Sequence, residues 1–215
     1  MNTVKRSLGG IKQFFIEVGE LSYFAGRFFK ELFKPPFEFK ELLRQCYHMG
    51  NRSLVLVMVT AFIIGLVLTL QSRPTLIEFG AESWMPNMVG ISIVRELGPV
   101  ITALVCAGRI ASGIGAELGS MRVTEQIDAM EVSGTNPFKY LVVTRILAIT
   151  LMLPLLVIIG DAVALYGSAL VENFKGNVSF QLYFNRVFDA LDYRDLVPAT
   201  IKSFFFGFAI GLVGC

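Results

Sequence analysis

Charged side chains inside apolar stretches are the residues of this sequence best suited to chemistry. Arg95 and Glu96 are adjacent in one such stretch, Arg109 follows in the same stretch, and Asp161 lies in another. Ionisable groups at membrane depth are costly unless paired or hydrated, which makes them candidates for function. Neighbouring residues of a helix point about 100° apart, so Arg95 and Glu96 cannot simply pair with each other. We expect either that one faces a cavity and the other a partner, or that both anchor a helix at the water interface. Arg109 and Asp161 could pair with each other, or each could bond to backbone.

The sequence gives little support for nucleophilic catalysis or for metal binding. His48 is the only histidine, so Ser112 in its apolar segment has no histidine base within any apolar stretch. The three cysteines match no metal-ligand or CxxC spacing; they are Cys46, Cys106 and Cys215. The phosphate-loop pattern GxxxxGK[ST] is absent from the chain. We therefore expect a protein that is not an enzyme, binds no metal or cofactor itself and takes any ATP hydrolysis from a partner.

The composition indicates an integral membrane protein. Hydrophobic residues make up 54% of the 215 residues, charged residues only 17%, and the mean hydropathy is +0.63. Soluble domains carry about 25% charged residues, so this much apolar surface has to face lipid. The net charge of +2, without a basic cluster interleaved with aromatics, argues against a nucleic-acid surface.

Four apolar segments predict an all-α, polytopic helical bundle. The first, 53–70, is uncharged and long enough to span a bilayer. The second runs from about 83 to 116 and is either one long helix or broken at Gly98-Pro99, while a loop from Pro74 to Pro86 precedes and overlaps it. The third is 146–171, and the fourth begins near 196 and is still apolar at Cys215. We expect a fifth span to be missing after residue 215.

The pattern of the N-terminal region predicts an amphipathic helix that lies in the membrane interface. Apolar residues recur at helical spacing over 11–33 with a Phe-rich face, Pro35-Pro36 ends the pattern, and a second amphipathic stretch covers 37–49. We divide the chain into interfacial and elbow helices at 1–50 and a membrane domain at 51–215. Nine Lys and Arg residues precede the first span, so the positive-inside rule predicts a cytoplasmic N-terminus and a cytoplasmic 117–145 loop, with 71–94 and 172–195 outside.

The cytoplasmic stretch 124–137 predicts a short, well-capped helix. Thr124 suits the N-cap, Gly134 the C-cap, and Pro137 follows. Acidic residues at 125, 128 and 131 share one face. Such a helix could dock into a groove on a motor subunit or could merely connect two spans, and the pattern leaves both readings open.

Small residues recur every fourth position in the stretch 95–120. One row is 111, 115 and 119, and another is 108, 112, 116 and 120. Small residues at this spacing allow close helix packing in lipid.

Three stretches of the sequence carry a resemblance: the run RELGPVITALVCAGRIASGIGAELGSMRVTEQIDAMEVSGTNPFKYLVVTRILA, LQ at 70–71 and LP at 153–154. They are very similar to the MlaE/YrbE permeases, the membrane subunits of MCE-associated ABC transporters. The resemblance extends over nearly the entire chain. It implies a fold like that of ABCG exporters, with five spans after the interfacial helix. It also implies a homodimer in the bacterial inner membrane, two ABC ATPase subunits that hold ATP and Mg, and a ring of MCE-domain proteins on the periplasmic side.

The resemblance implies a function and two sets of site residues. Such complexes move phospholipids or related lipids between the inner membrane and the outer envelope and so act on outer-membrane lipid asymmetry. The implied lipid-binding residues are Leu68, Gln71, Thr75, Phe79, Arg95 and Glu96. The stretch 124–134 matches the helix that couples to the ATPase, with Glu125, Gln126, Asp128, Met130 and Glu131 as contact residues. The alternative function is an ion-coupled secondary transporter or channel that uses Glu96 or Asp161, although no inverted repeat is visible.

Overall fold

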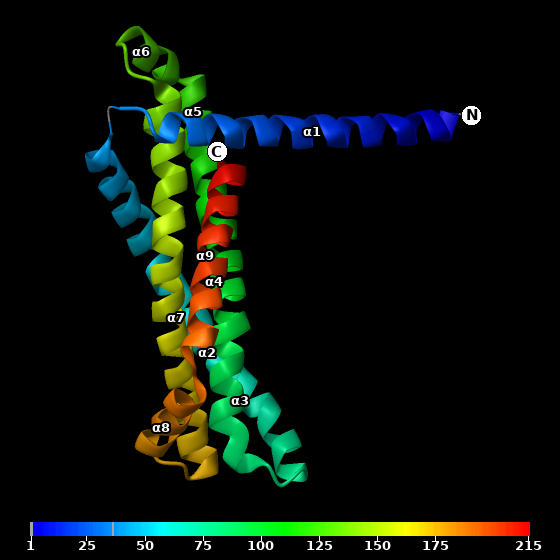
Figure 1. Cartoon of the computed structure of the whole chain (residues 1–215), viewed down its shortest axis with the longest axis vertical. Coiled ribbons are helices and arrows are strands. Elements are labelled where there is room, and N and C mark those ends of the chain that lie inside the picture. Colours follow the sequence, from blue (N-terminus) through cyan, green and yellow to red (C-terminus); the bar gives the residue numbers. More distant parts are fainter. Residues whose placement is uncertain (1, 36) are drawn as a thin grey trace.

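Long helical rods stand side by side, and a separate helix lies across one end of them (Figure 1). The computed structural model describes residues 2–35 and 37–215, which contain helices and no strand. The elements are α1 Asn2–Leu32, α2 Phe39–Glu78, η1 Glu82–Trp84, α3 Met85–Ser92, η2 Ile93–Leu97, α4 Gly98–Cys106, η3 Ala107–Ala111, α5 Ser112–Val123, α6 Gln126–Val132, η4 Phe138–Val143, α7 Thr144–Gly176, α8 Phe180–Ala190 and α9 Tyr193–Gly214.

Each rod is long and apolar enough to cross a membrane. The four candidate spans are Phe39–Glu78, Glu82–Val123, Phe138–Gly176 and Tyr193–Gly214. The predicted all-α polytopic membrane fold is therefore confirmed. The second span is one continuous helix that does not break at Gly98-Pro99; it instead contains two π-helical turns, η2 and η3.

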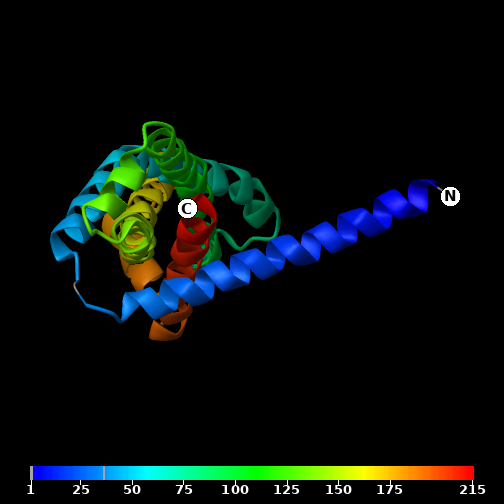
Figure 2. The same cartoon turned by 90° about the horizontal axis from the view of Figure 1, so that it is seen from above.

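The predicted amphipathic helix exists as α1 and packs at its C-terminal end. Phe28 of α1 is 2% exposed and packs against α9, with its ring 5.5 Å from that of Phe208. Phe24 makes an edge contact at 5.3 Å with Phe138 of η4, and the Arg27 guanidinium lies 4.2 Å from the same ring. Figure 2 shows the N-terminal part of α1 extending well beyond the bundle. This crosswise position suits a helix at the surface of a membrane.

Glycines set the close approach of α7 to its neighbours. A Cβ at Gly65 of α2 would overlap the Ala164 carbonyl oxygen of α7, and one at Gly167 would lie 2.7 Å from the Phe62 carbonyl oxygen. On the other side of α7, a Cβ at Gly207 of α9 would meet Thr150 at 2.8 Å. These contacts follow the small-residue rule for helices in lipid, but they involve residues outside the two rows that the sequence pattern singled out.

Most of the predicted small-residue rows lie on an exposed face of the chain. A Cβ at Gly108 or Gly119 would meet nothing within 4 Å among the described atoms, and at Gly115 only the Gly214 carbonyl oxygen at 3.9 Å. The other row members Ser112, Ala116 and Ser120 are also exposed. Ala111 is the exception, because a Cβ at Gly214 of α9 would meet its Cα at 3.0 Å. The expected close packing of these rows within the single chain is therefore limited to this one member.

The predicted loop from Pro74 to Pro86 is wrong over its first part. Helix α2 continues through Pro74 to Glu78 and is joined at its other end to the amphipathic stretch, so that it starts at Phe39. One proline removes a single backbone donor, which a long helix tolerates near its end. The true turn is short and contains Gly80 with φ 67. The predicted loop 172–195 likewise holds a helix, α8, whose N-cap Ser179 accepts a hydrogen bond from the Leu182 amide.

Candidate functional site at the two ends of the bundle

The π-helical turn η2 presents Arg95 and Glu96 from the second span. The Gly98 amide donates to the Ile93 carbonyl, five residues back, in place of the usual four. The next residue is Pro99, which has no amide to offer to the Arg95 carbonyl. Lys202 of α9 takes that place, with its Nζ 3.4 Å from the Arg95 carbonyl oxygen. A neighbouring helix thus completes the bonding of this irregular turn.

Both charged side chains of the turn have partners on α9. Glu96 Oε1 lies 2.8 Å from Lys202 Nζ, and Arg95 Nη1 lies 3.7 Å from Asp195 Oδ1. The expected division, in which one residue faces a cavity and the other a partner, does not occur in the single chain. Asp195 and Lys202 are seven residues apart, two helical turns, and this spacing of opposite charges is the signal that could have found them. Both side chains of the turn stay 59% exposed.

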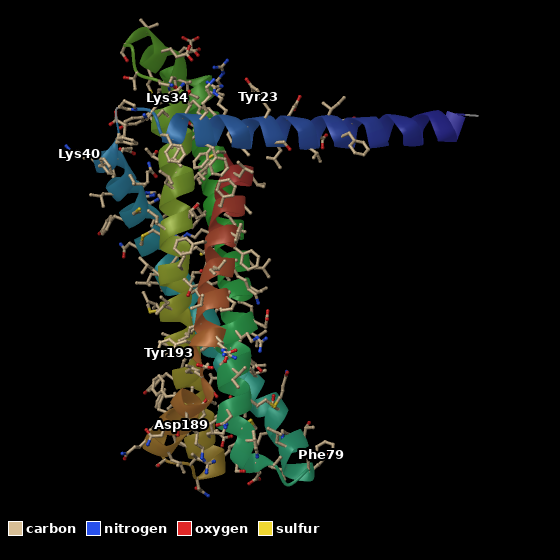
Figure 3. All side chains as sticks on the ribbon, in the orientation of Figure 1. Tyr23, Lys34, Lys40, Phe79, Asp189 and Tyr193 are labelled. Atoms are coloured by element: carbon tan, nitrogen blue, oxygen red, sulfur yellow. The ribbon has the colours of Figure 1, made fainter. Side chains whose placement is uncertain are left out.

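The other four predicted lipid-binding residues form one face at the end of α2. Leu68 is partly buried and packs on a core cluster that includes Met85 and Val89. Gln71 and Thr75 are exposed, and Phe79 is 80% exposed at the lower end of the molecule (Figure 3). None of the six predicted residues lines the best-formed cavities of the described chain. The structure therefore leaves all of them except Leu68 on exposed surface.

A buried polar network joins α2, α7 and α8 in the same half of the bundle. Tyr183 donates to Ser168 Oγ at 2.6 Å, and Ser168 shares a 2.6 Å hydrogen bond with Thr69. Burial raises the pKa of Tyr183 to about 12. Nearby, Arg73 Nη1 donates to the buried Glu172 Oε1 at 2.9 Å. Sequence periodicity gave no sign of this network, because its members are far apart in the chain.

At the opposite end, α6 projects beyond α1 (Figure 1). It covers Gln126–Val132, shorter than the predicted 124–134. Thr124 is not its N-cap: the Thr124 hydroxyl donates to the Ser120 carbonyl at 2.9 Å and so closes the preceding helix. The residue at the N-cap is Glu125, in a left-handed conformation with φ 56. A tight reversal between α5 and α6 requires that conformation.

The predicted C-terminal cap of this helix is confirmed. Gly134 has φ 79, and its amide donates to the Glu131 carbonyl at 3.0 Å. The Thr135 amide donates to the Met130 carbonyl, also at 3.0 Å. These two bonds form a Schellman motif, so the position of α6 is defined at both ends.

The acidic face of α6 points outward. Glu125, Gln126 and Asp128 are exposed, and Asp128 forms a 3.1 Å ion pair with Arg122 at the end of α5. Met130 is half-buried, and Glu131 is exposed at the rim of a cavity beneath the helix. That cavity has a volume of about 350 Å³ and is also lined by Arg122 and Phe138. Acidic and apolar surface is therefore available to a partner at this end of the bundle.

Arg109 and Asp161 do not pair. Arg109 Nη1 donates to the Arg52 carbonyl oxygen, so Arg109 contacts backbone as one alternative proposed. Asp161 is buried, and its Oδ1 has no hydrogen-bond partner in the described chain. Gly98 makes room for this carboxyl group, since a Cβ at Gly98 would overlap Asp161 Oδ1.

Known proteins resemble this chain over most of its length. The sequence model of the family described as "Permease MlaE" matches residues 42–215. A probable ABC transporter permease protein of Rickettsia typhi is 37% identical over 198 residues, which cover 92% of this chain and 76% of the relative. A probable ABC transporter permease protein of Synechocystis is 33% identical over 193 residues, 90% of this chain and 73% of the relative. The chloroplastic protein TRIGALACTOSYLDIACYLGLYCEROL 1 of Arabidopsis thaliana is 32% identical over 191 residues, 89% of this chain and 55% of that protein.

Proposed function

Because this chain belongs to the MlaE permease family and is the membrane subunit of an ABC transporter, we propose that it moves phospholipids or related lipids between the inner membrane and the outer envelope. Family membership is the observation that carries this proposal. The name of one relative, which refers to trigalactosyldiacylglycerol, supports a lipid as the substrate. The nine Lys and Arg residues before the first span support an inner-membrane protein with a cytoplasmic N-terminus.

The lipid site would combine the exposed face of α2 with the charged turn η2. Leu68 and Phe79 would contact acyl chains, while Gln71, Thr75, Arg95 and Glu96 would lie near the head group. Arg95 and Glu96 are 59% exposed in the single chain, and Phe79 is 80% exposed. A pocket made from these residues needs a second wall, and a second copy of the chain would supply it. This requirement supports the proposed homodimer.

The helix α6 would dock on the ABC ATPase subunits. It is short, defined at both ends and projects from the bundle with acidic residues exposed. Two ATPase subunits would hold ATP and Mg, and their closure would act on the lipid cavity through α6. A ring of MCE-domain proteins on the periplasmic side would pass lipid to or from the permease.

A reconstituted complex tests this function. The chain and its ATPase in one set of vesicles should exchange labelled phospholipid with an acceptor only when ATP is present. A hydrolysis-deficient ATPase in the same vesicles is the control. Lipid movement that needs no ATPase and follows a pH gradient would contradict the proposal.

That second result would favour the ion-coupled alternative. Its structural support is Asp161, a buried carboxyl group with an unpartnered oxygen in the third span. Glu96 is less suited to the same role, because Lys202 pairs with it at 2.8 Å.

A further inference from the structure

A polar groove lies between the first turns of α2 and the helix formed by α4, η3 and α5. Helix α2 leans away from the other rods over these turns (Figure 1). The groove has a volume of about 390 Å³, and it lies in the half of the bundle nearest α1, away from the residues proposed for lipid binding. Its polar lining includes Arg52, Ser53 and Arg109, and its apolar lining includes Met49, Ile110 and Ile114.

The groove carries an excess of positive charge. Neither Arg52 nor Arg109 takes part in any ion pair of the described residues. The carboxylate at the rim of the groove, Glu117, is already bound to Arg145 Nη2 at 2.9 Å and does not neutralise them. Arg109 is also held in place, because its Nη1 donates to the Arg52 carbonyl oxygen. Two guanidinium groups therefore line one groove, and no carboxylate of the described residues forms an ion pair with either of them.

Ser53 adds an unused polar group to the same groove. The residue is 1% exposed, lines the groove, and its Oγ has no hydrogen-bond partner in the described chain. A buried hydroxyl without a partner is unfavourable, and most such groups in folded proteins are satisfied by a protein atom, a water or a ligand. A bound anion beside Arg52 and Arg109 would accept its hydrogen bond.

The position of the groove indicates which anion it would hold. Arg52 directly precedes the uncharged run 53–70, so it marks the boundary between the hydrocarbon layer and the head groups. Guanidinium groups bind phosphate through two parallel hydrogen bonds. The apolar side chains of Met49, Ile110 and Ile114 lie beside them. Phosphate next to an apolar wall at the membrane boundary is the chemistry of a phospholipid.

We propose that Arg52, Arg109 and Ser53 bind the phosphate group of a phospholipid from the leaflet that faces α1. This site is separate from the one on α2 and η2, and would hold lipid at the opposite end of the transport path. The choice of lipid phosphate over free phosphate rests on the proposed function. The phosphate chemistry itself rests on the groove.

Native mass spectrometry of the purified full-length chain with phosphatidylglycerol tests the site. We expect the double variant R52Q/R109Q to bind this lipid at least about tenfold more weakly, since each guanidinium supplies a charge-assisted contact. Ser53→Ala should weaken binding by a few fold. The double variant K175Q/R194Q also loses two positive charges but outside the groove, so it should bind as the wild type does. Equal size-exclusion profiles would show that all of these variants fold.

The source of the phosphate and the location of the lipid need separate measurements. Inorganic phosphate should not displace the lipid at equal concentration; displacement would show an anion site and overturn the assignment to lipid. A photoreactive phosphatidylglycerol should label peptides containing 49–53 or 109–117 in the wild type and lose this labelling in R52Q/R109Q. Unchanged affinity and labelling in R52Q/R109Q would overturn the site alone. Failure of the wild type to bind any phospholipid would count against the proposed function as well.

Discussion

Lys202 binds two atoms of one π-helical turn: the Glu96 carboxylate at 2.8 Å and the Arg95 carbonyl oxygen at 3.4 Å. The second acceptor is available because Pro99 has no amide to offer it. A substitution at Lys202 therefore changes both the charge and the backbone bonding of the turn. The fourth span would respond to any movement of this turn in the second.

Charge exchange across this contact should restore activity that single changes remove. Glu96→Lys places two ammonium groups side by side and should lower lipid transport several-fold, and Lys202→Glu should do the same with two carboxylates. The double variant E96K/K202E restores opposite charges and should recover part of the rate. Transport by the reconstituted complex measures all three. A double variant no more active than either single one would show that pairing at this position is unimportant.

Gly65 should be the least replaceable small residue between α2 and α7. Gly65→Ala places a methyl group on the Ala164 carbonyl oxygen, and such overpacking costs about 1–3 kcal/mol. Gly108→Ala is the matched control, since a Cβ there meets nothing within 4 Å of the described atoms. The thermal midpoint in detergent should fall for the first variant and hold or rise for the second. Equal midpoints would contradict the close approach of the two helices.

Removing the Tyr183 hydroxyl should cost stability and alter its dependence on pH. Tyr183→Phe loses one buried hydrogen bond, worth about 1 kcal/mol. The pKa of Tyr183 is raised to about 12, against about 10 for an unfolded tyrosine. The folded state thus holds this proton more tightly, and its contribution is complete below pH about 10 and lost as the pH rises towards 12.

Thermal midpoints of the wild type and the Tyr183→Phe variant at pH 8 and pH 11 check both points. The wild type should lose more stability than the variant between these two values. Tyr193→Phe, which changes an exposed tyrosine, should behave as the wild type does. An equal loss in the wild type and Tyr183→Phe would indicate that Tyr183 is not shielded as described.

Charge reversal on α6 should separate the permease from its ATPase. Lysine at positions 125, 128 and 131 replaces the acidic surface with a basic one, so the yield of ATPase in a pull-down should fall at least several-fold. Membrane insertion should not change, because these residues are exposed and lie outside the four candidate spans. Asp189→Lys on α8, at the opposite end of the molecule, is the control and should retain the ATPase. Full recovery of ATPase by the α6 variant would exclude these acids as the docking surface.

Local sequence patterns were sufficient to predict the long helices but not the side-chain contacts between them. The uncharged run 53–70 predicted the first span, and Gly134 predicted the end of α6, because hydropathy and left-handed glycine caps are properties of adjacent residues. Glu96 and Lys202 are 106 residues apart in sequence, so their pairing depends on the packing of the second span against the fourth. The same is true of Ser168 and Thr69, whose hydroxyls meet only after α2 packs on α7. Thr124 illustrates a competition within the sequence, since its hydroxyl could cap the following helix and instead closes the preceding one.

The crosswise position of α1 has a mechanical consequence. Its 31 residues give a length of about 46 Å, and the contacts of Phe24 and Phe28 hold it near one end, on η4 and α9. A rotation of about 5° at that end would move the far end by about 4 Å for a helix of this length. Small tilts of the spans would therefore be amplified into displacements at the membrane surface. By the same leverage, bending or thinning of the bilayer under α1 would exert torque on α9, whose Asp195 and Lys202 contact the charged turn.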